Sequence, residues 1–219
     1  WALPAEDPCG LYGVTCSAGH VMRLRLADNG LHGALPEALG ALSGLVELDL
    51  SANRLSGAIP GVLGALPRLT ILHLGANALS GPLPASLGDL ARLSDLDLGH
   101  NMLWTDDATL QGFLDLRDPG WSRTQTVPPA DLAATPLSGG ARLSWTPGAS
   151  RVDGGHYEVG IAAEPGGPYT PAGVTADRAA GGIDVEGLAP GRTHSLAVRA
   201  HAPARGEQAN ALTSPYGRE

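Results

Sequence analysis

The sequence contains no lysine, because all 14 of its basic residues are arginine. A chain without a lysine amine has no side chain for Schiff-base catalysis. Acidic residues number 22 and the formal net charge is −8, so we expect no nucleic-acid partner, which would need a basic face. Arginine as the sole strong base, with much alanine, glycine and proline, is typical of a GC-rich genome, and we expect a bacterial source.

Long apolar runs and the common catalytic motifs are also missing. No run approaches the ~18 residues of a membrane-spanning helix, so no membrane span is expected in this segment. No Gly-x-Ser-x-Gly, His-Glu-x-x-His, Cys-x-x-Cys, P-loop or dinucleotide-binding motif occurs. We therefore expect no enzyme activity, catalytic residue, cofactor or metal. No signal peptide precedes Trp1, so we expect a mature or trimmed part of a longer protein.

What the chain does contain is a 24-residue repeat over residues 21–103. Each copy carries two alternating leucines, and Gly-x-[Leu/Ile]-Pro follows at 33–36, 57–60 and 81–84. The leucine runs are closed by Asn29, Asn53, Asn77 and Asn101. The pattern L-x-x-L-x-L-x-x-N-x-L resembles the leucine-rich repeat, and the Gly-x-[Leu/Ile]-Pro extension resembles its plant-type subclass, which also occurs in bacterial surface proteins. The resemblance implies a right-handed solenoid with a parallel sheet and short helical or 3-10 segments.

The repeat also has a direct physical interpretation. Alternating apolar and polar residues have the period of a half-buried strand, and one such strand cannot bury its leucines alone. Stacked coils form a parallel sheet with a continuous apolar interior. Each asparagine follows a strand where the chain turns inward, and its amide can both donate to and accept from backbone groups there. We therefore predict that the four asparagines form a buried structural ladder.

The first twenty residues precede the repeats and contain both cysteines. Asp7-Pro8-Cys9 and Gly13-Val14-Thr15-Cys16 resemble the N-terminal cap of plant-type leucine-rich repeats, although Leu11-Tyr12 replaces the inner tryptophan of that family. We predict that residues 1–20 cap the solenoid and that Cys9 and Cys16 form a disulfide. Two thiols without a second pair are too few to hold a metal. A disulfide implies an oxidising compartment, either extracellular or periplasmic.

The concave face of the repeat sheet is the predicted binding surface. Its candidate residues are Arg23, Glu47, Ile71 and Asp95 in one row, Arg25, Asp49, His73 and Asp97 in the next, and Asp28 and His100 further round. They can bind a partner, or the row Arg25–Asp49–His73–Asp97 can form cross-strand ion pairs with itself. A metal held by the histidines and aspartates is a weaker alternative, because spacing alone rarely makes a site.

After Asn101 the repeat stops, and we expect that no fifth coil begins. Helical spacing of apolar residues predicts a short helix with Thr105 or Asp106 as its cap and Pro119 at its end. The apolar residues are Leu110, Phe113 and Leu114. Three aromatic residues are expected to cover the last coil, with an aromatic ligand platform as the alternative: Trp104, Phe113 and Trp121. Polar, proline-ended residues 122–129 indicate a linker.

From residue 130 onward, short alternating strands separated by glycine- and proline-rich turns predict an antiparallel sandwich. Trp145, Tyr157 and Leu188-x-Pro190-Gly191 resemble the core tryptophan, the strand-C tyrosine and the turn before strand F of a fibronectin type III domain. His194 stands where that family has the tyrosine of its corner hydrogen bond, and we expect it to make a weaker bond to upstream backbone. The last strand is expected around 210–219, either short or continued beyond the chain.

We therefore predict a mainly β protein in which residues 21–121 form the capped solenoid and residues 130–219 a fibronectin type III-like domain. The expected function is recognition of a protein or peptide at the extracellular or cell-surface side, with a carbohydrate partner as an alternative. A structural spacer of a larger surface protein is the second hypothesis. The third is an accessory module of an enzyme encoded outside this segment. The predicted binding function rests on the resemblance to these folds and not on an identified site.

Overall fold

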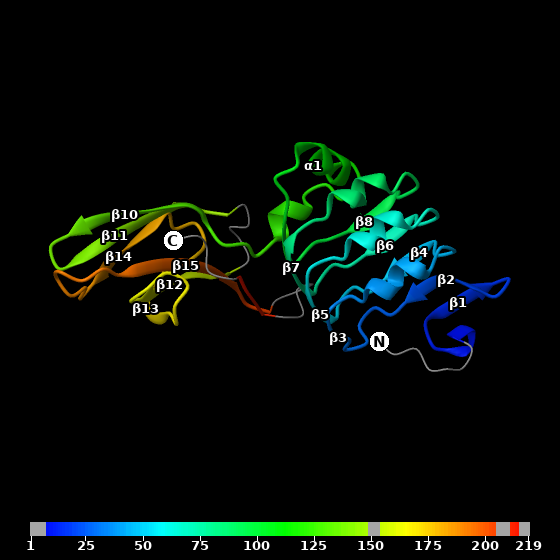
Figure 1. Cartoon of the computed structure of the whole chain (residues 1–219), viewed down its shortest axis with the longest axis horizontal. Coiled ribbons are helices and arrows are strands. Elements are labelled where there is room, and N and C mark those ends of the chain that lie inside the picture. The colour runs from blue at the N-terminus through cyan, green and yellow to red at the C-terminus, as the bar shows by residue number, and fades with distance from the viewer. Residues whose placement is uncertain (1–7, 149–153, 205–210, 215–219) are drawn as a thin grey trace. The chain divides into compact units, whose positions relative to one another are not determined.

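The computed structural model describes residues 8–148, 154–204 and 211–214, which are mainly β structure. The chain divides into two compact units, and the main boundary between them lies between Gln125 and Thr126 (Figure 1). Among the described residues, no helix is long and apolar enough to cross a membrane. Each unit has its own apolar core.

The first unit is built on a sheet in which four parallel strands lie side by side (Figure 1). They are β2 (His20–Arg25), β4 (Glu47–Asp49), β6 (Ile71–His73) and β8 (Asp95–Asp97). The register places Leu24, Leu48, Leu72 and Leu96 in one line. These leucines are buried, so each coil covers the apolar side of the next, as the repeat pattern predicts.

The other side of each coil is completed by a second parallel sheet and by short helical turns. The sheet consists of β3 (His32–Gly33), β5 (Arg54–Gly57), β7 (Ala78–Pro82) and β9 (Met102–Trp104). The 3-10 turns are η2 (Glu37–Ala41), η3 (Gly61–Ala65) and η4 (Ala85–Asp89), and each follows the proline of a Gly-x-[Leu/Ile]-Pro segment. Leucines from all of these segments fill one core.

Asparagines connect the coils through buried hydrogen bonds. The amide of Asn77 donates to the carbonyl oxygens of Leu50, Leu74 and Gly75 at 3.0–3.2 Å, and its Oδ1 accepts from the backbone N–H of Leu55 at 3.0 Å. Asn53 and Asn101 are equally buried and bonded in the same way. Such bonds satisfy backbone groups that the turns would otherwise leave unpaired.

Asn29, which we expected to be buried in the same ladder, is exposed. Its amide donates to the carbonyl of Ala27, two residues away, at 2.8 Å. Its own backbone N–H donates to Oδ1 of Asn53 at 3.0 Å. Asn29 belongs to the first coil, so no earlier leucine-rich coil covers it.

The ladder has a fifth member that the sequence interpretation placed in the linker. Gln125 follows Asn101 by 24 residues and is 2% exposed. Its Oε1 accepts from the N–H of Leu103 at 2.9 Å, and its Nε2 donates to the carbonyls of Leu98 and Trp121 at 2.9 Å. The ladder therefore continues one interval beyond Asn101, although the chain forms no strand between β9 and β10.

In the segment that follows β9, side chains take the place of a further strand and accept the hydrogen bonds of the sheet's last edge. In the preceding coil the backbone N–H of Leu74 donates to the carbonyl of Asp97. One coil later the N–H of Leu98 donates to the carboxylate of Asp118 at 2.8 Å, and the N–H of His100 donates to Oγ1 of Thr124 at 3.1 Å. These side chains therefore supply acceptors at a sheet edge that would otherwise stay open.

The last coil is covered by α1 (Ala108–Asp115) and the 3-10 turn η5 (Trp121–Thr124). Asp107 caps α1, one position beyond the residues we expected, and its carboxylate accepts from the N–H groups of Thr109 and Leu110. Trp121 is buried in the core, whereas Trp104 is 43% exposed. Of the three aromatic residues expected to cover this end, Trp104 does not do so.

At the other end, the predicted disulfide between Cys9 and Cys16 is confirmed, with Cα atoms 5.5 Å apart. Cys9 lies in η1 (Pro8–Gly10) and Cys16 in β1 (Val14–Ser17). Strand β1 pairs antiparallel with β2 and forms the first edge of the sheet. It therefore lies over the edge at which the leucine repeats begin.

The second unit contains two antiparallel sheets whose inner faces share one core. One has the order β10-β11-β14: β10 (Ala130–Leu137), β11 (Gly140–Thr146) and β14 (Gly182–Glu186). The other has the order β13-β12-β15-β16: β13 (Thr170–Val174), β12 (His156–Ala162), β15 (Ser195–Ala202) and β16 (Leu212–Thr213). Strand β13 was not predicted, because Pro171 and Gly173 give it a weak strand pattern.

Two aromatic side chains hold this core together. The rings of Trp145 and Tyr157 meet edge to face with their centroids 5.4 Å apart. The indole N–H of Trp145 donates to the carbonyl of Ala180, and the hydroxyl of Tyr157 accepts from the N–H of Gly148, both at 2.8 Å. Both polar tips are thus satisfied inside an apolar core.

The turn before β15 contains the bond that was expected from His194. Its Nε2 lies 3.3 Å from the carbonyl oxygen of Ala189, five residues upstream. The expected last strand is represented by the two residues of β16, and residues 215–219 lie outside the described part.

Candidate functional site

The predicted binding residues lie in two adjacent rows across the parallel sheet of the first unit. The first row pairs Arg23 with Glu47, Glu47 with Ile71, and Ile71 with Asp95. The second row contains Arg25, Asp49, His73 and Asp97 in the same register. The 24-residue period brings these side chains together from four coils, because equivalent residues in neighbouring parallel strands align.

The ion pairs run along the first row, between Arg23 and Glu47, and between the two rows, from Arg25 to Glu47 and from His73 to Asp95. Arg25 donates two hydrogen bonds to the carboxylate of Glu47, at 2.6 and 2.9 Å, and Nε of Arg23 lies 3.4 Å from the same carboxylate. Glu47 is consequently only 7% exposed. Its hydrogen bond and charge raise the pKa of the Arg25 guanidinium above the usual value. The alternative in which the second row pairs with itself is therefore not found, because Arg25 pairs with Glu47 of the first row.

The aspartates of the second row accept hydrogen bonds from residues of their own coils. Oδ1 of Asp49 accepts from the N–H and the hydroxyl of Ser51, at 3.1 and 2.7 Å. Oδ1 of Asp97 accepts from the N–H of Gly99 at 2.9 Å. Both carboxylates thereby hold the turn that follows their strand, in the manner of an Asx turn. Their role here is structural.

The side chains in the middle of the surface make fewer contacts within the fold. Nε2 of His73 lies 3.0 Å from the carboxylate of Asp95, whose side chain is 56% exposed. Ile71 is partly buried beside them, on the same strand as His73. An apolar side chain flanked by a histidine and an exposed carboxylate can contact both apolar and cationic groups of a partner.

The remaining two candidates, Asp28 and His100, occupy equivalent turns at opposite ends of the sheet. Both have left-handed backbone, with φ of 51° and 54°, and Ala52 and Ala76 share this conformation in the coils between them. Asp28 is exposed and His100 is partly buried. The structure does not bring the two residues together.

His100 borders a cavity of about 550 Å³ at the end where the sheet stops. Its acidic lining residues are Asp97 and Asp118, and Trp121 and Thr124 complete that side. Burial raises the pKa of Asp118, its hydrogen bond from Leu98 opposes that shift, and the charge of Asp97 adds to it. Sequence analysis did not identify Asp118. Its position seven residues before Gln125, in the turn that ends the sheet, is the signal that could have indicated it.

Among the described residues, no group of three or more histidine, cysteine, aspartate or glutamate side chains is arranged to hold a metal ion. The metal alternative for His73, His100, Asp95 and Asp97 therefore finds no support in the geometry. What these residues form is an open, charged surface beside one acidic cavity.

The family match with known proteins lies within the first unit. Residues 19–79 match the family model described as leucine rich repeat. A stretch of 46 residues is 48% identical to the receptor protein kinase WSS1 of Oryza sativa subsp. japonica, which is 20% of this chain and 5% of that protein. The chain thus matches only a small part of that relative's length.

Two solved structures are also similar to about half of the chain. The plant peptide hormone receptor RGFR1 in complex with RGF2 is 31% identical, with 50% of this chain and 20% of that chain covered and a TM-score of 0.42. The ectodomain of the receptor kinase SOBIR1 from Arabidopsis thaliana is 30% identical and has a TM-score of 0.41. The similarity covers 50% of this chain and 78% of that chain. The family match over residues 19–79 includes β2, β4 and β6, so this part of the first unit carries the leucine-rich repeat pattern.

Proposed function

We propose that this chain is a recognition module of an extracellular or cell-surface protein, and that it binds a protein or peptide on the concave face of the repeat sheet. The observation that carries the proposal is the alignment of side chains from four coils on one open sheet. The buried leucines and asparagines beneath hold the backbone of that sheet rigid, so little ordering is needed on binding.

The middle of the sheet is the proposed centre of contact. Ile71 offers the apolar anchor, and His73 and the exposed Asp95 offer polar contacts around it. Interfaces gain most of their free energy from a few such central residues, while the surrounding charges select the partner. Arg23 and Arg25 flank this centre on the side of the first coil.

Two further features support an extracellular location. The disulfide between Cys9 and Cys16 forms and persists in oxidising compartments. The matched stretch is similar to part of a receptor protein kinase.

We propose that the second unit is a fibronectin type III-like sandwich that serves as a spacer or second contact. Its support is the core tryptophan Trp145, the buried Tyr157 and the turn bond of His194, each at the position that the resemblance implies. Residues 1–20 are proposed as the N-terminal cap. The solenoid is proposed to extend from residue 21 through Gln125, which shortens the linker.

The test begins with a phage-displayed library of random peptides and an array of extracellular proteins, both selected on the whole chain. Each selected ligand is then measured on a variant with Ile71→Ala, His73→Ala and Asp95→Ala. We expect this variant to bind at least about tenfold more weakly, because a central anchor and its polar neighbours are removed. Glu47 is left unchanged, because its buried carboxylate holds two arginines.

The matched control carries Glu37→Ala, Arg54→Ala and Asp89→Ala, three exposed residues outside the concave rows. It should bind like the unmodified chain, and circular dichroism should show both variants folded. Equal binding by the two variants, or no ligand in either screen, would remove the concave face as the binding site. That result would favour the spacer function, which the mutually satisfied ion pairs of Glu47 also allow.

A further inference from the structure

A second hollow, separate from the concave rows, lies in the first unit near the starts of the parallel strands. Its volume is about 420 Å³, and it is lined by Met22, Val46, Pro67, Arg68, Thr70 and Arg92. The backbone N–H of Val46 donates to the carbonyl of Met22, and that of Thr70 donates to the carbonyl of Val46, at 2.8 and 2.9 Å. These bonds continue the sheet beyond β4 and β6, so the floor of the groove is rigid.

The two arginines of this groove occupy the same position in successive coils. Arg68 and Arg92 are 24 residues apart, which places their backbones about 5 Å apart in parallel neighbouring coils. Both side chains are exposed. Within the described ranges, neither guanidinium has a hydrogen bond or ion pair with another side chain.

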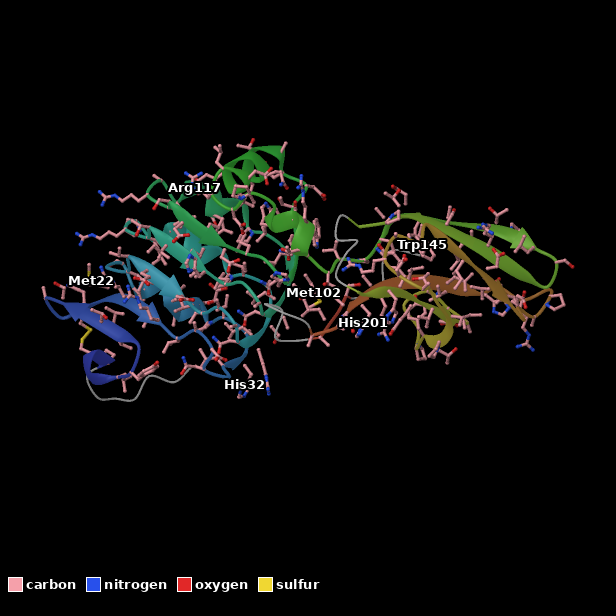
Figure 2. All side chains as sticks on the ribbon, turned by 180° about the vertical axis from the view of Figure 1, so that it is seen from behind. Met22, His32, Met102, Arg117, Trp145 and His201 are labelled. Atoms are coloured by element: carbon pink, nitrogen blue, oxygen red, sulfur yellow. A yellow bond between two sulfur atoms is a disulfide. The ribbon has the colours of Figure 1, made fainter. Side chains whose placement is uncertain are left out.

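Other arginines of the same unit are already engaged. Arg23 and Arg25 hold the carboxylate of Glu47. Arg117, beside α1 in Figure 2, donates to the carbonyls of Leu93 and Phe113 and lies over the Phe113 ring, 3.7 Å from its centroid. Each of these three guanidinium groups thus has a partner within the unit, whereas Arg68 and Arg92 have none among the described side chains.

The lining of the groove defines the chemistry of that partner. No carboxylate is among the residues that line it, although the chain as a whole has a net charge of −8. An arginine guanidinium matches a carboxylate with two parallel hydrogen bonds. Met22, Val46 and Pro67 add an apolar floor, and methionine adapts to varied apolar side chains at binding surfaces.

We propose that this groove binds an extended acidic segment of a partner protein. Carboxylates of the segment pair with Arg68 and Arg92, and an apolar side chain between them packs on Met22 and Val46. The apolar floor favours a peptide over an acidic polysaccharide, because a peptide can place an apolar side chain between two carboxylates. This surface does not include Ile71, His73 or Asp95, so its function is independent of the concave face.

The experiment uses the whole chain and a short fluorescein-labelled peptide of alternating glutamate and leucine. Fluorescence anisotropy should show binding at low salt that weakens as salt screens the charges. Arg68→Glu with Arg92→Glu should weaken binding about tenfold or more, because both attractive pairs become repulsive. The milder Arg68→Gln with Arg92→Gln should weaken it less, which keeps the test informative if the charge reversal disturbs folding.

The control is Arg54→Glu with Arg123→Glu, which makes the same change in net charge at exposed positions outside the groove. It should retain binding within about twofold, since only screened long-range charge is altered. Equal losses in both double variants would overturn the proposal, as would equal binding of a glutamine–leucine peptide. Binding of sodium polygalacturonate without binding of the glutamate peptide would assign the groove to acidic polysaccharides and overturn the peptide assignment.

Discussion

The two units of this protein satisfy their buried groups in different ways. In the first unit, one contact set recurs in successive coils, as in the bonds that Asn53, Asn77 and Asn101 make to equivalent backbone groups. In the second unit, each contact occurs once, such as the bond of Trp145 to Ala180 and that of Tyr157 to Gly148.

This difference explains where each unit can carry function. Repetition lets a few buried residue types hold the solenoid, so the concave residues are free to vary from coil to coil. The rows accordingly change from arginine to an acidic residue, then to isoleucine or histidine, and then to aspartate. The second unit depends on single residues of its core, which suits a spacer that presents a stable shape.

The largest expected effect concerns the single-copy core of the second unit. Trp145→Ala should lower the free energy of unfolding of that unit by about 3–5 kcal/mol, because a large buried ring is removed and its cavity stays partly open. Differential scanning calorimetry should show the loss in one transition, with the transition of the leucine-rich unit unchanged. Equal shifts in both transitions would mean that the two units unfold as one.

A smaller effect is expected within the ladder, where position decides the outcome. Asn77→Ala should cost about 1–3 kcal/mol for the backbone groups it leaves unpaired, since these lie in the core. Asn29→Ala should cost less than about 0.5 kcal/mol, because Asn29 is exposed. Urea unfolding followed by circular dichroism measures both. Equal costs would contradict the distinction between inner and terminal coils.

At the end of the ladder, Asp118 allows charge and hydrogen bonding to be separated. Asp118→Ala should cost about 1–3 kcal/mol, because the backbone N–H of buried Leu98 loses its acceptor. Asp118→Asn keeps an acceptor and removes the charge, so it should be nearly neutral at acidic pH.

The pH dependence follows from the raised pKa of Asp118. A carboxyl whose pKa is higher in the folded state contributes stability below its unfolded pKa, and that contribution is lost as pH rises through the folded pKa. The stability of Asp118→Asn relative to the unmodified protein should therefore increase from about pH 4 upward. Urea titrations at several pH values measure it, and a constant difference would show that the charge is unimportant.

The smallest effect is expected for an ion pair on the outer face of the second unit. Burial raises the pKa of Glu158, but the hydrogen bond and charge of Arg199 outweigh it, and the net pKa is lowered. The stability from this pair is present above the unfolded pKa of Glu158 and is lost as pH falls through the folded pKa. Arg199→Met should thus cost less than about 1 kcal/mol at pH 7, and the difference should shrink below about pH 4 as the pH falls toward the lowered pKa of Glu158.

The control for this change is Arg142→Met, which removes the more exposed pair with Asp184. It should have an even smaller effect at either pH. A cost at acidic pH equal to that at pH 7 would assign the role of Arg199 to packing of its aliphatic stem.

Periodic residues were predictable because the contact that each one makes is set by its place in the repeat. The leucine strands and the register of the two concave rows follow from the 24-residue spacing. Gln125 was missed because the search required asparagine, although the longer amide makes equivalent bonds at the same interval. Strand β13 was missed because neighbouring strands supply the pairing that its own residues do not signal.

The sequence by itself determined the repeat, the apolar interior of the solenoid, the disulfide and the short-strand character of the second unit. These depend on local periodicity and on residue types with one stable environment. Only the tertiary structure decided which charges meet, because pairing depends on side-chain reach as well as register. It placed Glu47 between two arginines, turned Asp49 and Asp97 into turn caps, and left Arg68 and Arg92 open to a partner.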